Sequence, residues 1–338
     1  MDADQVVVGI DNGATKNNAT VLDASGRFLV DRMYEIPSRV GDGPEAAIEA
    51  MAETMDLVLR ETGIGPERVA AVGLDTPGPA SADGVISAKG ATNFSQQAWW
   101  GYDVRGALEA RIGLPTVYNN DGNAAALYAH HVHFGADAPM RSSVSAIVGT
   151  GLGGGVIEAG SVIRGASGQA GELGHVQIFT DGLLADDQPM PTCNCGNPGD
   201  VESFASLTGI VRNLLPYWLT RYSDHPLAAV PILQAAKELR TFGVDGDEMA
   251  LKVFEQQAAA LGRLFTIAAN FTDPSAYFVG GGVVEAAPHF SQWFVERVRA
   301  HTSLREEQAA VATFALVADR DMAGARGSAF AALASIGG

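Results

Sequence analysis

Basic residues are scarce in this chain. Lys and Arg total 22 against 39 Asp and Glu, so the 338 residues carry a formal net charge of −17. A surface of that sign repels phosphate backbones, and we therefore expect no nucleic acid among the partners. An anionic ligand would need a local nest of backbone N–H groups.

Cysteines and long apolar runs are equally rare. The chain has two cysteines, Cys193 and Cys195, which cannot build a disulfide framework and so favour a reducing cytoplasm. No apolar run approaches the roughly 20 residues of a membrane-spanning helix. The start, MDADQVVVGID, is acidic and leads directly into a predicted strand, unlike a signal peptide. We therefore expect a cytoplasmic protein without membrane association. With 47% hydrophobic and 18% charged residues, the composition excludes general disorder.

The two halves of the chain begin in the same way. Strands are predicted over 5–11, 17–23 and 27–35, and the segment 142–165 repeats the order strand, small-residue turn, strand. Helices and further strands follow each hairpin, including a long helix over about 247–270. This repetition predicts a duplicated α/β fold, with a small ligand in the cleft between two domains.

Two turns of small residues are candidate phosphate cradles. The segment 149–154 has the form G-x-G-x-x-G, but a strand-like stretch follows it, whereas a dinucleotide fingerprint requires a helix. A hairpin without a ligand and a nest of N–H groups around an oxyanion both remain open. The segment 11–16 offers the same device, and its carboxylate, Asp11, beside phosphate would imply a cation between them. The triplet 280–282 is either a third part of the cradle or a turn into a helix.

Asp121 is the candidate general base. It follows a predicted strand and precedes the apolar helical stretch NAAALYA. A carboxylate in that position can accept a proton from a substrate hydroxyl, or it can cap the helix.

The chain resembles the ROK (repressor, open reading frame, kinase) family, chiefly its glucokinase-like sugar kinases, from about residue 5 to the end. The motifs that carry the resemblance, in order, are Asp11-x-Gly13-Ala14-Thr15-Lys16, Pro77-Gly78-Pro79, Asn120-Asp121-x-Asn123-Ala124, Gly149-Thr150-Gly151-Leu152-Gly153-Gly154-Gly155, Gly171-Glu172-x-Gly174-His175, Cys193-x-Cys195-Gly196-x-x-Gly199 and Gly280-Gly281-Gly282. The family's repressors carry a DNA-binding segment ahead of the sugar-binding part. We expect none here, because the first predicted strand begins the chain.

The resemblance implies the duplicated fold shared by actin, the hexokinases and the Hsp70 chaperones. We expect a smaller domain of residues 1–119 plus a C-terminal helix over about 322–338, and a larger domain of residues 120–321. The implied activity is transfer of the γ-phosphate of ATP, with Mg²⁺, to a hydroxyl of glucose or a related hexose, above all the 6-hydroxyl. Asp121 would be the catalytic base. A homodimer or homotetramer is also implied.

The resemblance also assigns ligand-binding roles. For the nucleotide it implies Asp11, Gly13, Ala14, Thr15, Lys16, Gly149, Thr150, Gly151, Gly153, Gly280, Gly281 and Gly282. For the sugar it implies Gly78, Asn93, Asn120, Asp121, Glu172, His175 and Glu202.

A structural zinc site is implied by the same comparison. The family uses a histidine and three cysteines, which match His175, Cys193 and Cys195, whereas Asp200 stands in place of the third cysteine. A carboxylate can bind zinc, so the set is chemically sound. Free thiols without metal, or a strained Cys-x-Cys disulfide, are the alternatives.

Departures from the family pattern leave other functions open. Asn12 replaces an apolar residue, Ala14 replaces a glycine, and the segment around 186–189 looks longer than usual. The alternatives are a sugar-binding regulator with weak catalysis, a kinase for an N-acetylated or amino hexose, and a kinase that uses polyphosphate. No basic run supports the last of these.

Overall fold

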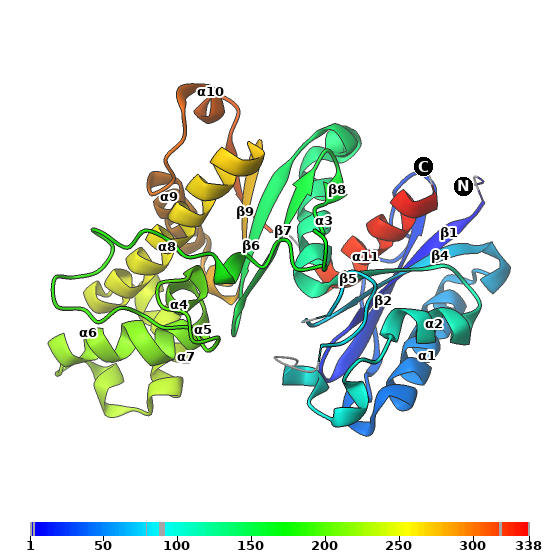
Figure 1. Ribbon diagram of the computed structural model, residues 1–338, viewed down its shortest axis with the longest axis horizontal. Helices are drawn as coiled ribbons and strands as arrows, with labels where there is room; N and C mark the ends of the chain where they lie inside the picture. Colours follow the sequence, from blue (N-terminus) through cyan, green and yellow to red (C-terminus); the bar gives the residue numbers. More distant parts are fainter. Residues whose placement is uncertain (1, 3, 79, 88–91, 318–319, 337–338) are drawn as a thin grey trace. The chain divides into compact units, whose positions relative to one another are not determined.

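A computed structural model describes residues 2, 4–78, 80–87, 92–317 and 320–336 of the chain (Figure 1). Pro79 of the predicted sugar motif and positions 337–338 of the predicted C-terminal helix lie outside the described residues. The chain divides into two compact units. Unit 1 is Met1–Met140, Gly155–Gly171 and Ala318–Gly338, and unit 2 is Arg141–Gly154 and Glu172–Val317.

Unit 1 contains a five-stranded sheet in the order β3-β2-β1-β4-β5. Its strands are β1 (Val6–Asn12), β2 (Lys16–Asp23), β3 (Tyr34–Pro37), β4 (Val69–Thr76) and β5 (Thr116–Asn120). The strands β1, β4 and β5 are mutually parallel, whereas β2 is antiparallel to both of its neighbours. The strand predicted over 27–35 is wrong for most of its length. Only β3 forms there, and Phe28 makes an isolated bridge to Leu22.

Helices cover both faces of this sheet. The helices α1 (Pro44–Thr62) and α2 (Val104–Ile112) pack on one face, and α3 (Asp121–Phe134) and α11 (Arg320–Ile336) pack on the other (Figure 1). Apolar residues alternate between the two faces along the central strand: Val8 belongs to the core under α1, and Val7 to the core under α11. The predicted division at 119/120 assigned α3 to the second domain, whereas α3 lies in unit 1, where it packs against α11.

Glycines allow α11 to lie directly on the sheet. A Cβ atom at Gly9 of β1 would stand 1.9 Å from the carbonyl oxygen of Ala325, and one at Gly73 of β4 would stand 1.8 Å from that of Ser328. No side chain fits at that separation. Because side chains alternate along a strand, the residues two positions further on, Asp11 and Asp75, also face α11.

Replacement of Gly73 by Ala is therefore expected to destabilise the protein. The added methyl would displace the α11 backbone, and overpacking of this kind costs about 1–3 kcal/mol. The measurement is the free energy of unfolding in denaturant. Gly41→Ala is the matched control, because no atom lies within 4 Å of a Cβ at that position. An unfolding free energy of Gly73→Ala equal to that of the control would contradict this view of the packing.

Unit 2 is organised around a second sheet, in the order β10-β9-β6-β7-β8. Its strands are β6 (Ser143–Val148), β7 (Leu152–Glu158), β8 (Ser161–Val162), β9 (Ala276–Gly281) and β10 (Thr313–Leu316). The division between the units falls within β7, so β8 and the end of β7 belong to unit 1. Stacked rings at the centre of unit 2, such as Tyr277 and Phe314 at 4.7 Å, fill the space between β9, β10 and the long helix α8 (Glu248–Thr272).

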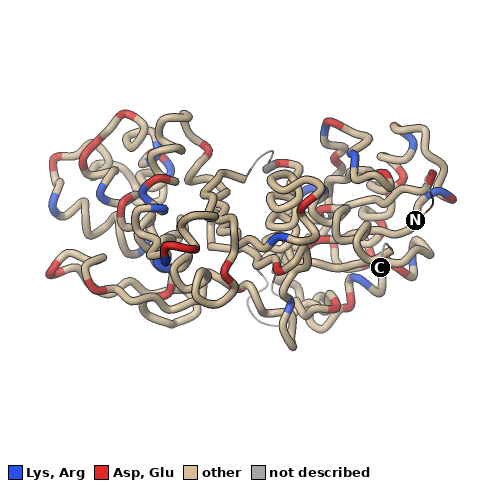
Figure 2. The backbone as a smooth tube through the Cα atoms, turned by 90° about the horizontal axis from the view of Figure 1, so that it is seen from above, with Lys and Arg blue, Asp and Glu red and all other residues tan. Residues whose placement is uncertain are grey.

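The other helices of unit 2 are shorter. They are α4 (Val201–Ala205), α5 (Leu207–Gly209), α6 (Leu215–Arg221), α7 (Ile232–Val244), α9 (Pro288–Ala300) and α10 (Glu306–Ala309). Figure 2 shows that acidic residues occur in both units, interspersed with Lys and Arg. Among the described residues, no helix combines the length and the apolar composition needed to cross a membrane.

Candidate active site and metal centre

Three carboxyl groups gather at the carboxyl ends of the parallel strands of unit 1. Asp11 on β1 lies opposite Asp75 on β4, and Asp121 begins α3 directly after β5. This edge of a parallel sheet is where α/β proteins bind their ligands. Asp11 and Asp121 were predicted from the sequence, whereas Asp75 was not, although it also lies near the end of a buried strand.

The pKa values of all three carboxyl groups are raised above the ordinary value of an aspartate. Burial raises the pKa of Asp11 to about 6, and the nearby charges of Asp121 and Glu35 act in the same direction. Burial together with Asp11 raises the pKa of Asp75 well above its ordinary value. The surrounding protein also raises the pKa of Asp121, while the N–H of Gly122, 2.8 Å from Oδ1, opposes the shift. A raised pKa makes the ionised Asp121 carboxylate a stronger base.

Asp121 is not the cap of its helix. The Oδ1 atom of Asn120 accepts a hydrogen bond from the backbone N–H of Asn123 at 2.7 Å, which makes Asn120 the N-cap of α3. The capping role considered for Asp121 is therefore wrong. Its side chain is exposed in the first turn of α3, where it remains available to a ligand.

The first small-residue turn connects β1 to β2. The N–H of Gly13 donates to the carbonyl of Lys16 at 2.9 Å, and Ala14 and Thr15 are exposed at the tip. The Lys16 ammonium lies 2.6 Å from Glu35 Oε2, so its positive charge is paired within unit 1.

Three further residues of unit 1 belong to the predicted motifs and sites. Asn12, which departs from the family pattern, is buried and donates from Nδ2 to Asn17 Oδ1 at 2.6 Å, beneath the hairpin. Of the predicted sugar ligands, Gly78 follows β4 and Asn93 is exposed in the short turn η3 (Thr92–Phe94).

The second small-residue turn lies in unit 2, between β6 and β7. Because a strand follows it, the dinucleotide-binding pattern is excluded. The carbonyl of Gly149 accepts from the N–H of Leu207, and that of Thr150 accepts from both the N–H and the hydroxyl of Thr208, at 3.1 and 2.8 Å. The start of α5 therefore holds the backbone of the turn, in which Gly149, Thr150 and Gly153 are exposed.

The glycine triplet 280–282 lies beside this turn. Strand β9 is parallel to β6, with Gly281 opposite Val148. Gly281 has a φ of 86°, and a Cβ there would lie 2.1 Å from the carbonyl of Val148. Only glycine fits, because both the backbone angle and the space exclude a side chain. The two predicted nucleotide segments of unit 2 thus meet at one end of adjacent strands.

Glu202 on α4 connects the glycine turn with the cysteine segment. Its Oε2 accepts from the N–H of Leu152 at 2.9 Å, and its Oε1 accepts from the thiol of Cys193 at 3.2 Å. The sequence predicted Glu202 as a sugar ligand and missed both contacts. Glu172, the other predicted glutamate, directly precedes the turn η6 (Leu173–His175).

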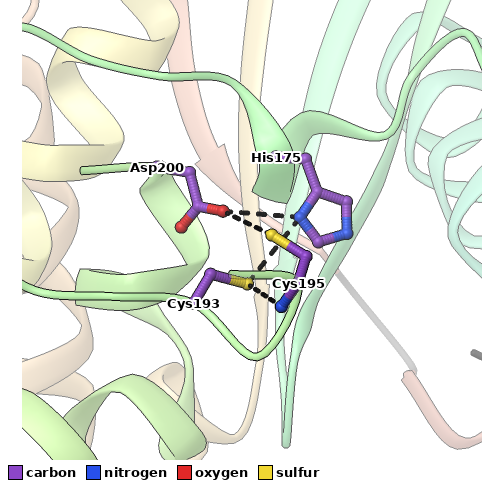
Figure 3. A group of neighbouring side chains, drawn as sticks. All are labelled: His175, Cys193, Cys195 and Asp200. Atoms are coloured by element: carbon purple, nitrogen blue, oxygen red, sulfur yellow. Dashed lines mark hydrogen bonds and ion pairs between the residues drawn. The ribbon is translucent and has the colours of Figure 1, made fainter. Parts of the chain in front are cut away.

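The four predicted zinc ligands come together in unit 2 (Figure 3). Their ligand atoms all lie within 4.8 Å of one another. Asp200 Oδ2 lies 3.5 Å from His175 Nδ1 and 3.5 Å from Cys195 Sγ, and Cys193 Sγ lies 3.9 Å from His175 Nδ1. Tetrahedral zinc with these donor types separates neighbouring ligand atoms by about 3.3–3.8 Å. The residues fit a zinc ion, and both cysteines are free thiols, so the disulfide alternative is wrong.

Asp200 uses its two oxygens for two purposes. Oδ1 accepts from the N–H of Ser203 at 2.9 Å and caps α4, while Oδ2 faces the other ligands. The side chain is fully buried. A cysteine has one sulfur and cannot serve both roles, so the aspartate combines a helix cap with a candidate metal ligand.

Known proteins resemble the chain over nearly its whole length. Residues 7–335 match the ROK family. A glucokinase of Halalkalibacterium halodurans is 29% identical over 311 residues, covering 88% of both chains. The solved structure of a ROK hexokinase from Thermus thermophilus superposes with a TM-score of 0.76 at 31% identity, covering 98% of this chain and 99% of that one.

A ROK family glucokinase from Streptomyces griseus, solved with glucose and AMPPNP, gives a TM-score of 0.66 at 27% identity over 97% of this chain and 99% of that one. These likenesses confirm the predicted duplicated α/β fold of the actin and hexokinase type. The chain belongs to the ROK family.

Proposed function

We propose that this chain is an ATP-dependent hexose kinase that phosphorylates glucose or a related hexose, at the 6-hydroxyl. The observation that carries the proposal is the position of Asp121. Asp121 is exposed at the ligand-binding edge of the sheet and does not cap α3, and the pKa of its carboxyl group is raised. The kinase relatives and structures described above support the same activity.

The proposed reaction needs one base and one phosphoryl acceptor. Asp121 accepts the proton of the sugar hydroxyl as that oxygen attacks the γ-phosphorus of ATP. The bond from the γ-phosphorus to the β,γ-bridging oxygen breaks, and ADP leaves with the electron pair. A positioned base of this kind contributes about 10²- to 10⁴-fold to the rate, and alignment and charge neutralisation supply the remainder.

Each unit contributes nucleotide-binding candidates. In unit 1, residues 14–16 are exposed at the hairpin tip, and the Asp11 carboxylate suits Mg²⁺, which binds oxygen donors. When bound, Mg²⁺ would neutralise charge on the phosphate oxygens. In unit 2, the turn 149–153, which α5 and Glu202 hold in place, exposes Gly149, Thr150 and Gly153, and the partly exposed Gly281 and Gly282 lie beside it.

The sugar ligands remain a proposal by resemblance, as do cytoplasmic location and assembly into a dimer or tetramer. They are Gly78, Asn93, Asn120, Asp121, Glu172, His175 and Glu202. Paired carboxylates and amides suit a ring of hydroxyl groups, because they accept and donate hydrogen bonds together. Zinc bound to His175 would fix that ring, whose other nitrogen could then donate to a hydroxyl.

The test is ATP-dependent release of ADP over a panel of hexoses that includes N-acetylated and amino sugars, with the phosphorylated product identified. We expect one hexose to be turned over strongly. The same assay with inorganic polyphosphate in place of ATP tests which of the two is the phosphoryl donor. If no hexose is turned over but one raises the unfolding temperature, the kinase proposal is wrong and the chain is a sugar-binding regulator.

A further inference from the structure

A row of polar side chains crosses four strands of unit 1 beneath α11. Asp11 lies opposite Asn18 on β2 and opposite Asp75 on β4, and Asp75 lies opposite Asn119 on β5. Neighbouring residues in register place their side chains on the same face of a sheet. Three of the four, Asn18, Asp75 and Asn119, are at most 5% exposed, and Asp11 is partly exposed.

Asp75 is the buried carboxyl group of this row. Its side chain is fully inaccessible, and its Oδ2 accepts from the hydroxyl of Ser328 on α11 at 2.8 Å. Among the described residues, no Lys, Arg or His forms an ion pair with it, and no donor reaches its Oδ1. Its carboxyl group instead contacts that of Asp11. A carboxyl group buried in this way costs stability, so a purely structural role explains it poorly.

Asp11 is confined from two directions. Asp75 contacts it from the neighbouring strand, and Gly324 of α11 faces it from above. A Cβ atom at Gly324 would stand 2.8 Å from both Cγ and Oδ2 of Asp11. The Asp11 side chain therefore has little freedom on the side covered by α11, although the residue is partly exposed.

We infer that Asp75, held by Ser328, is a positioning residue that orients the Asp11 carboxylate toward the magnesium-bound phosphates of the nucleotide. The inference rests on the proposed function. Asp75 does not touch the substrates. It acts through Asp11. Its hydrogen bond with Ser328, 253 residues later in the chain, connects it to α11.

The test compares five variants, one of them a control, by steady-state kinetics. Asp75→Ala is expected to lower kcat/KM for MgATP by about 10- to 100-fold, the effect of one hydrogen bond to a charged group, with the KM for the hexose nearly unchanged. Asp75→Asn, which keeps the shape and can still accept from Ser328, recovers most of the loss. Gly324→Ala reproduces the defect by displacing Asp11 directly.

The matched control is Ser335→Ala on the same helix, whose hydroxyl donates to the carbonyl of Ala332. Its kinetics are expected to equal those of the wild type. Ser328→Ala, the same chemical change beneath Asp75, should weaken MgATP use. If Ser328→Ala and Ser335→Ala have the same kcat/KM for MgATP, the inference that Ser328 holds Asp75 in position is overturned.

A binding measurement separates positioning from general damage. The Kd for ADP is measured with Mg²⁺ and with EDTA, in wild type and in Asp75→Ala, alongside thermal unfolding. Positioning predicts that the variant loses the gain in affinity due to Mg²⁺ but keeps the affinity in EDTA. An equal loss under both conditions, or an unchanged gain from Mg²⁺, overturns the inference. If the wild type phosphorylates no hexose, the proposed function fails, while this binding result still decides the role of Asp75.

Discussion

Replacing Asp121 by Asn is expected to lower kcat by about 10²- to 10⁴-fold. The amide has nearly the same shape as the carboxylate but cannot accept the proton of the attacking hydroxyl. The fold should be unaffected, because Asn120 rather than Asp121 caps α3. The measurement is ADP release at saturating hexose and MgATP, with thermal unfolding of the same preparations.

The control for this substitution is Asp56→Asn on α1, which makes the same chemical change at an exposed position of that helix. It should leave kcat unchanged. The wild-type enzyme should also lose activity as the pH falls through the raised pKa of Asp121, because the base must be ionised. A kcat for Asp121→Asn above a tenth of the wild-type value would remove Asp121 from its role as the base.

If zinc is bound as proposed, its removal by a chelator is expected to have the largest effect on stability. Four ligands from a segment that runs from His175 to Asp200 converge in unit 2, so zinc would stabilise the folded state. At a free zinc concentration 1,000 times its Kd, a bound ligand contributes about 4 kcal/mol. For a unit of this size that corresponds to a fall in Tm of roughly 10 °C on chelation. The purified protein should contain one zinc per chain.

Substitutions at Asp200 separate the metal from the helix cap. Asp200→Asn still accepts from the N–H of Ser203 but loses the anionic ligand, so it should bind zinc more weakly while keeping the metal-free stability. Asp200→Ala should lose about 1 kcal/mol more, because the cap disappears as well. Cys195→Ser, at an exposed ligand, should lower zinc content without a capping effect. Well under one zinc per chain in unchelated protein, with no effect of chelator on Tm, would reject the metal centre.

Local patterns predicted most of the elements that carry the site. The small-residue turns, the long helix α8 and the strand that ends at Asn120 follow from the spacing of apolar residues and glycines. The strand predicted over 27–35 failed because β-branched and aromatic content alone does not provide a partner for the ladder. In the folded chain only Tyr34–Pro37 pairs with β2.

Contacts that depend on distant partners were missed. Glu202 was predicted as a sugar ligand, and its contact with the N–H of Leu152 joins positions 50 residues apart. Asp200 was predicted as a metal ligand, and its role as a helix cap became visible only from the start of α4. A sequence shows which groups a residue has, whereas the fold decides which partners they meet.

The sequence by itself determined the family, the duplicated α/β fold and the candidate base, because motifs and apolar periodicity depend only on residues that are close together in the chain. Only the tertiary structure decided that Asp75 is part of the site. Its position at the end of a buried strand is unremarkable until β1 and β4 come into register and α11 closes over both. Close contacts such as that of Gly73 with Ser328 exist only in the packed chain, so the surroundings of a buried carboxyl group are a property of the fold.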